Sequence, residues 1–225
     1  MIGQKKRTMT TSTNNILETQ GAVWWRKPCH ITEDILISGD LSHDFAKAKE
    51  QLKTWRREGI THIIDCRQEW NDEQIVGEHG EGIKYFWHGT HDSGGSQQAS
   101  WYKRGWDFYE QVTENDPNAK VLVHCHMGIN RAPSMAFYLM IREGYMPAEA
   151  LKLIRTNRPI AACLYAESAW RTFAEEDNLS DEETTIGLRE ISEFFADNQI
   201  DPSTAIRQIR QVERQGNVPF PSEQV

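Results

Sequence analysis

The residues best suited to chemistry are a cysteine and an arginine in the segment HCHMGINR, residues 124–131. Cys125 and Arg131 are separated by five residues, the apolar run VLVH precedes them, and the helical pattern APSMAFYLMIRE follows. This order predicts a buried strand, a short loop and a helix that begins near Arg131. The N–H groups of such a loop have no helical partners and can converge on an anion, which the positive end of the helix dipole also attracts.

The residue types in this loop suit phosphoryl transfer to sulfur. The field of the helix N-terminus favours a thiolate at Cys125. Gly128 permits the backbone conformations that a tight nest of amides requires. Arg131 offers a planar fork for two phosphoryl oxygens. Together these groups predict attack of a thiolate on a phosphoryl group.

The segment HCHMGINR resembles the His-Cys-x5-Arg motif of the protein tyrosine phosphatase superfamily. The downstream helices resemble its dual-specificity branch, over roughly residues 30–175. This resemblance implies a phosphatase that hydrolyses phosphomonoesters of phosphotyrosine and phosphoserine/threonine proteins through a phosphocysteine intermediate. It implies that His124 orients the loop and tunes the thiolate. It also implies that phosphate is bound by Arg131 and by the backbone amides of the loop, at His126, Met127, Gly128, Ile129 and Asn130.

The chemistry of the branch also requires a general acid that protonates the leaving oxygen. In relatives this acid is an Asp about thirty residues before the cysteine. Asp92 lies 33 residues before Cys125, in the Gly/Ser-rich loop GTHDSGGSQQ. We therefore expect Asp92 to be the acid, with His88 and His91 as alternative proton donors.

Two further positions modify this expectation. Relatives usually carry Ser or Thr directly after the arginine, where the hydroxyl stabilises the departing cysteine thiolate, but this chain has Ala132. We expect slow breakdown of the phosphocysteine for that reason. Cys66 ends a predicted strand beside the loop. A lipid-phosphatase relative has a cysteine in a similar context that forms a reversible disulfide with its nucleophile, so Cys66 is a candidate redox partner or simply a small core residue.

Other functions use similar features. An RNA 5′-triphosphatase is the nearest alternative, because GINR resembles the Gly-x-Asn-Arg of that branch. A rhodanese-like sulfurtransferase and a pseudophosphatase that binds phosphoproteins without turnover are further alternatives. No cofactor or metal is expected, since the eight histidines form no ligand array and the four cysteines lack zinc-ligand spacing. The loop contains no lysine, which disfavours inositol lipids as substrates.

Along the chain, apolar patterns typical of strands alternate with patterns typical of helices, which predicts an α/β fold. We expect a central, mostly parallel sheet with helices on both faces, as in dual-specificity phosphatases. Two amphipathic helices in residues 182–214 should form a C-terminal helical hairpin that docks on the main domain or contacts a second copy or partner. The expected divisions are a flexible leader (1–21), a phosphatase domain (22–178) and a C-terminal helical extension (179–225).

Composition limits the class of protein. Hydrophobic residues make up 38% of the chain and charged residues 26%, which is typical of a globular domain. The net charge of −8 disfavours a general nucleic-acid surface. No apolar run is long enough to span a membrane, and no secretion signal is evident, so we expect a cytoplasmic protein with reduced thiols.

Overall fold

The computed structural model describes residues 24–215. Its centre is a five-stranded sheet with the spatial order β1-β2-β5-β3-β4, in which only β1 is antiparallel to its neighbour. The strands are β1 (Cys29–His30), β2 (Ile35–Ser38), β3 (His62–Arg67), β4 (Lys84–Thr90) and β5 (Val121–His124). The predicted mostly parallel sheet is therefore confirmed. Its middle strand is β5, whose continuous apolar sequence suits a strand paired on both edges.

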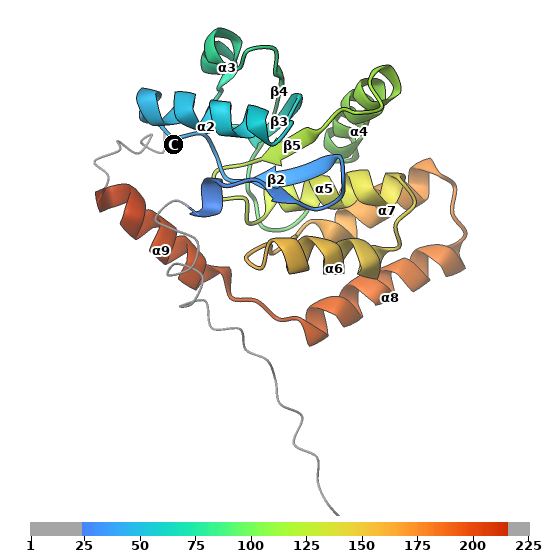
Figure 1. Cartoon of the computed structure of the whole chain (residues 1–225). Helices are drawn as coiled ribbons and strands as arrows, with labels where there is room; N and C mark the ends of the chain where they lie inside the picture. The colour runs from blue at the N-terminus through green and yellow to red at the C-terminus, as the bar shows by residue number, and fades with distance from the viewer. Residues whose placement is uncertain (1–23, 216–225) are drawn as a thin grey trace, which may run out of the picture.

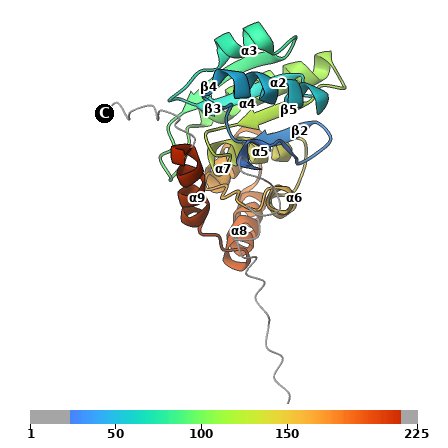
Figure 2. The same cartoon turned by 60° about the vertical axis from the view of Figure 1, so that its left-hand side comes forward.

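Helices cover both faces of the sheet, as predicted (Figure 1). One face is covered by α2 (Phe45–Arg57) and α3 (Glu73–His79). The other face is covered by α4 (Ala99–Asn115), α5 (Arg131–Arg142), α6 (Pro147–Asn157) and α7 (Ala166–Glu176). Figure 2 shows the same layers from another side.

The alternation of side chains along each strand separates two apolar cores. Leu36, Ile63 and Leu122 point toward α2 and pack with its buried face. Their sequence neighbours point to the opposite face and pack around α5, whose residues are buried from Arg131 to Ile141. Because of this alternation, two consecutive residues at the end of β5 must face opposite sides of the sheet.

The short helix α3 was not predicted from the sequence. Its segment EQIVGEH has Val76 as its one fully buried residue, so the sequence carries too few apolar positions for a periodic signal. The 3-10 turn Trp24–Arg26, with all three residues buried, was also missed.

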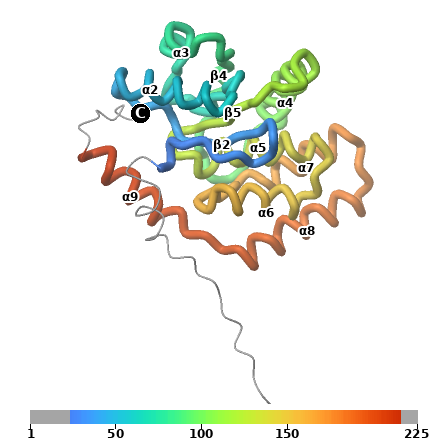
Figure 3. Tube along the Cα trace, in the orientation of Figure 1, coloured from blue at the N-terminus to red at the C-terminus, as the bar shows by residue number. Residues whose placement is uncertain are grey.

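The C-terminal extension contains the two expected helices, α8 (Asp181–Asp197) and α9 (Pro202–Gln215). Ser180 and Glu183 form a capping box at the start of α8. The predicted hairpin is opened out: α8 packs on α6 and α7, whereas α9 turns away toward the residues around Trp24 (Figure 3). The expected leader, residues 1–21, and the last ten residues of the extension lie outside the described residues. Across residues 24–215, no helix has both the length and the apolar character to cross a membrane.

Candidate active site

The loop between β5 and α5 is held from outside through its carbonyl groups. His126 O accepts from Asp40 N at 3.0 Å, and Ile129 O accepts from Ala162 N at 2.6 Å. The Met127 and Gly128 carbonyls accept from Arg158, at 2.9 and 2.6 Å. A peptide C=O points away from the N–H of the next residue. The N–H groups of residues 127–130 therefore point the other way, and none donates a hydrogen bond within residues 24–215. Such an arrangement of N–H groups at a helix N-terminus could bind an anion.

Gly128 is required by this geometry, as its expected role implied. Its φ is +62°, in the left-handed region that side chains disfavour. A Cβ there would lie 2.3 Å from Arg158 Nη2 and 2.6 Å from Ser38 O. The tight turn and the close approach of Arg158 both depend on this glycine.

Arg158 anchors the loop through hydrogen bonds that the sequence did not reveal. Its side chain is 2% exposed, and besides the two loop carbonyls it donates to Trp25 O at 2.9 Å. The planar guanidinium thus ties the loop to the N-terminal turn. Because its partners are main-chain carbonyls 30 or more residues away, no residue pattern could have indicated this role.

Arg131 is oriented by Glu69, a second residue that the sequence did not single out. Arg131 Nη1 and Nη2 each donate to one carboxylate oxygen of Glu69 at 2.7 Å, and Nη1 also donates to Thr90 O at 3.1 Å. Burial opposes the charge of Glu69, but hydrogen bonding and the positive charge of Arg131 outweigh it and lower the Glu69 pKa. Arg131 Nε has no hydrogen-bond partner among the described residues. The Nε–Nη2 edge, which Asp92 Oδ2 approaches to 3.5 Å at Nε, could donate to two oxygens of a ligand.

The structure brings Asp92 to this loop. Asp92 Oδ1 accepts from Asn130 Nδ2 and from the Tyr165 hydroxyl, both at 2.7 Å. Asp92 Oδ2 lies 3.5 Å from Arg131 Nε. The side chain of Asn130 therefore connects the Asp92 loop to the loop between β5 and α5, and Asp92 stands where an acid could reach a group bound by Arg131.

The alternative donor His88 points elsewhere. Its Nε2 hydrogen-bonds to Trp101 O at 2.7 Å, and its ring stacks on the Trp101 indole. Burial lowers the pKa of His88 to about 4, so the imidazole is neutral at neutral pH. His88 therefore packs under α4 and does not serve the loop.

His124 and Cys125 face opposite sides of the sheet. Cys125 is 3% exposed and lies in the α5 core together with Cys66. Asp65 is paired with His124 across β3 and β5, so Cys66 and Cys125 follow at neighbouring positions. Burial, and then the neighbouring Cys125, raise the pKa of Cys66 well above its usual range. The His124 ring instead lies beside Trp55, 5.8 Å between ring centroids, so its imidazole is not brought to the thiol.

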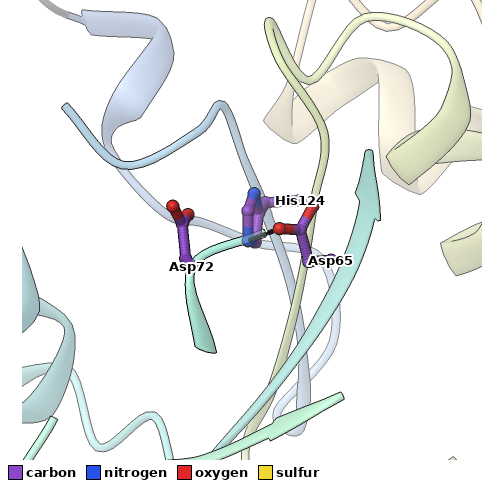
Figure 4. Close-up of side chains that lie close together, drawn as sticks. All are labelled: Asp65, Asp72 and His124. Atoms are coloured by element: carbon purple, nitrogen blue, oxygen red, sulfur yellow. Dashed lines mark ion pairs between the residues drawn. The ribbon is translucent and has the colours of Figure 1, made fainter. Parts of the chain in front are cut away.

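Asp65, Asp72 and His124 form a buried cluster of ionisable side chains (Figure 4). Candidate ligand atoms of Asp65, Asp72 and His124 lie within 4.8 Å of one another. However, Arg67 donates to both oxygens of Asp65, at 2.9 and 2.7 Å, and also to Asp72. Burial lowers the pKa of His124. Because the Arg67 guanidinium already occupies oxygens of both carboxylates, these residues form a buried ion-pair network and do not suit a metal ion.

Position 132 has no hydroxyl, and the nearest hydroxyl in the sequence, that of Ser134, binds other groups. Ala132 is fully buried, and Ser134 Oγ accepts from Tyr165 N at 3.3 Å while lying 3.5 Å from Asn130 Oδ1. Ser134 thus links Asn130 of the loop to the start of α7. In residues 24–215 no side-chain hydroxyl is hydrogen-bonded to Cys125 Sγ.

Comparison with known proteins places this geometry in a family context. The family described as the dual specificity phosphatase catalytic domain matches residues 44–171. Dual specificity protein phosphatase 26 from Homo sapiens is 28% identical over 152 residues, covering 65% of this chain and 69% of that protein. The Bos taurus protein of the same name is 30% identical over 107 residues, covering 47% and 50%.

Solved structures share the fold at low sequence identity. The crystal structure of PTPMT1 has a TM-score of 0.53 at 18% identity, covering 68% of this chain and 99% of its own. A mouse putative dual specificity phosphatase complexed with zinc tungstate has a TM-score of 0.54 at 16% identity, covering 71% and 92%. The α/β architecture predicted from the sequence is therefore that of known phosphatase structures.

Proposed function

The chain belongs to the dual specificity phosphatase family and is a cysteine-dependent protein phosphatase, and from this premise we propose that residues 124–131 are its catalytic loop. Cys125 is the nucleophile, and Arg131 binds two phosphoryl oxygens through Nε and Nη2. The observation that carries the proposal is the loop itself: its carbonyls are anchored outward, which leaves the N–H groups of residues 127–130 without acceptors among the described residues.

The reaction follows from these positions. The Cys125 thiolate attacks phosphorus, the bond from phosphorus to the leaving oxygen breaks, and a proton from Asp92 neutralises that oxygen. Oδ2 is the proton-carrying atom, because Oδ1 already accepts two hydrogen bonds. The Asp92 carboxylate then takes a proton from water, which attacks the phosphocysteine and releases inorganic phosphate and the thiolate. Backbone N–H groups of residues 126–130 and the Arg131 guanidinium stabilise the charge on the transferred group.

The substrates we propose are phosphotyrosine and phosphoserine/threonine proteins. The family match favours neither the RNA 5′-triphosphatase nor the pseudophosphatase alternative. A reducing compartment such as the cytoplasm is part of the proposal, because the reaction needs a free thiolate and all four cysteines are free. Both C-terminal helices dock on their own domain, so a homodimer through residues 182–214 is not part of it.

Ala132 and Cys66 add two finer proposals. With no hydroxyl at position 132, departure of the Cys125 thiolate from phosphorus limits turnover. Cys66 protects the nucleophile: peroxide oxidises Cys125 to a sulfenic acid, and the Cys66 thiol then attacks that sulfur, forming the disulfide and releasing water. The adjacent register of the two residues and their shared core cluster support this step.

The roles of the three residues are tested on phosphopeptides and on p-nitrophenyl phosphate. Cys125→Ser should abolish turnover while retaining binding, and Arg131→Lys should weaken tungstate binding. Asp92→Asn should lower kcat by about 100-fold or more on phosphopeptides but far less on the activated aryl ester, because a good leaving group needs no proton. Arg171→Lys and Asp107→Asn are matched controls at exposed positions. Full activity of Cys125→Ser would refute the assignment.

A further inference from the structure

One side of α9 covers the side chains of the catalytic loop. The buried residues of α9 are Ala205, Ile209 and Glu213, which recur every four positions and so share one face of the helix. Ala205 and Ile209 form a core cluster with Met127 and Ile129 of the loop. One face of the C-terminal helix therefore lies in the same apolar cluster as the catalytic loop.

The third member of this face, Glu213, is a buried carboxylate. It is 7% exposed, its Oε1 lies 3.0 Å from His126 Nε2, and Arg26 Nη2 is 3.8 Å away. Its Oε2 has no hydrogen-bond partner among the described residues. A buried carboxylate is costly unless a charged partner compensates it. His126, the residue directly after Cys125, is the nearest such partner.

Other charges around His126 act in the same direction. Burial alone would lower its pKa, but the hydrogen bond to Glu213 and the charges of Asp40, Glu213 and Glu69 outweigh burial and raise it. Asp40 N also donates to His126 O at 3.0 Å, and its carboxylate accepts from Arg26 Nε at 2.9 Å. His126 is thus held at its carbonyl by the β2–α2 connection and at its side chain by α9.

We propose that Glu213 is a positioning residue for the phosphatase reaction, acting through its ion pair with His126. This pair fixes the first residue after the nucleophile, so the amide nest stays formed, and keeps a positive imidazolium next to the thiolate. The C-terminal helix is then part of the support of the active site. This inference rests on the proposed function of residues 124–131.

The test is a double-mutant cycle in the full chain with Glu213→Gln, His126→Gln and the double variant. We expect Glu213→Gln to lower kcat/KM by about tenfold, the scale of a lost hydrogen bond to a charged group. In the His126→Gln background, Glu213→Gln should cause little further loss of kcat/KM. Glu193→Gln, at an exposed position of α8, makes the same chemical change away from the loop and should leave kcat/KM unchanged.

The second readout is the titration of His126, followed by NMR in protein with labelled histidine. Removing the Glu213 charge should move the midpoint to lower pH. The loss of kcat/KM that accompanies deprotonation of His126 on raising the pH should move with it. Glu213→Asp keeps the charge but moves it away by one methylene, so the midpoint of the His126 titration should lie between those of wild type and Glu213→Gln. This variant keeps the test available if Glu213→Gln folds poorly.

Two outcomes would overturn the inference. One is an unchanged His126 titration in both Glu213 variants. The other is an equal loss of kcat/KM from Glu213→Gln with and without His126, which would show a general structural effect. Failure of the proposed function itself is recognised separately, because wild-type protein would then show no activity that depends on Cys125.

Discussion

Replacing Arg158 tests whether carbonyl anchoring shapes the catalytic loop. Arg158→Met removes the guanidinium but keeps a long apolar side chain, and Arg158→Lys keeps the charge without the planar fork. Both variants should leave the Met127 and Gly128 carbonyls without their present donors. The peptide planes can then rotate, which turns the following N–H groups away from the anion site.

The magnitude follows from the two buried carbonyls of Met127 and Gly128, which lose their donor. Trp25 O, the third acceptor of Arg158, keeps the hydrogen bond from Gly39 N at 2.6 Å. Each unpaired buried acceptor costs about 1–3 kcal/mol. The variant also avoids burying the guanidinium, which offsets part of this cost. We expect Arg158→Met to lower the free energy of unfolding by about 3 kcal/mol, equivalent to a Tm lower by about 6–12 °C for a chain of this size.

The effect on function should be similar in free energy to the effect on folding, because a 100-fold change in rate corresponds to about 2.7 kcal/mol. At a temperature where both proteins are folded, we expect kcat/KM to fall by about 100-fold, because a displacement of about 1 Å at reacting groups has this scale. Tungstate binding, measured by calorimetry, should weaken in parallel, and Arg158→Lys should lie between wild type and Arg158→Met. Arg171→Lys, at an exposed position, is the control.

The result that would refute this reasoning is a loss of stability without a loss of anion binding. If Arg158→Met unfolds at lower urea but binds tungstate and turns over substrate as wild type does, the loop keeps its shape without the clamp. Arg158 would then be a core residue only.

Three further predictions concern other positions. Burial lowers the pKa of His88 to about 4, below the value near 6.5 in the unfolded chain, so the unfolded state gains the proton first as pH falls. The free energy of unfolding should therefore drop by about 3 kcal/mol more in wild type than in His88→Gln between pH 6.5 and pH 4, and equal urea curves would contradict this. Ala132→Ser should raise the steady-state rate and remove a product burst in stopped-flow traces, whereas a wild type without a burst would count against slow breakdown of the phosphocysteine. Cys66→Ser should recover less activity than wild type when peroxide treatment is followed by a thiol reductant. Peptide mapping of oxidised wild type should yield a Cys66–Cys125 disulfide. Equal recovery of the two proteins would make Cys66 a packing residue.

The sequence by itself determined the features that depend on neighbouring residues. The strand, loop and helix around Cys125 were predicted because they are contiguous, and their apolar periods differ. The capping box at Ser180 and the turn at Gly128 were predictable for the same reason, since each is a local backbone requirement. The spacing of Asp92 from Cys125 carried information only through resemblance to a family.

Only the tertiary structure decided which groups support the site. Glu69 is 62 residues from Arg131, and Glu213 is 87 residues from His126, so each looked like a solvated charge in the sequence. Arg158 binds carbonyl oxygens, which every residue possesses and which therefore leave no trace in the residue pattern. His124 and Cys125 face opposite sides of the sheet because side chains alternate along a strand. Which residues contact His124 is decided by packing. Residues that carry out chemistry are constrained in type, whereas residues that hold them in place are constrained by position, and position is set by the fold.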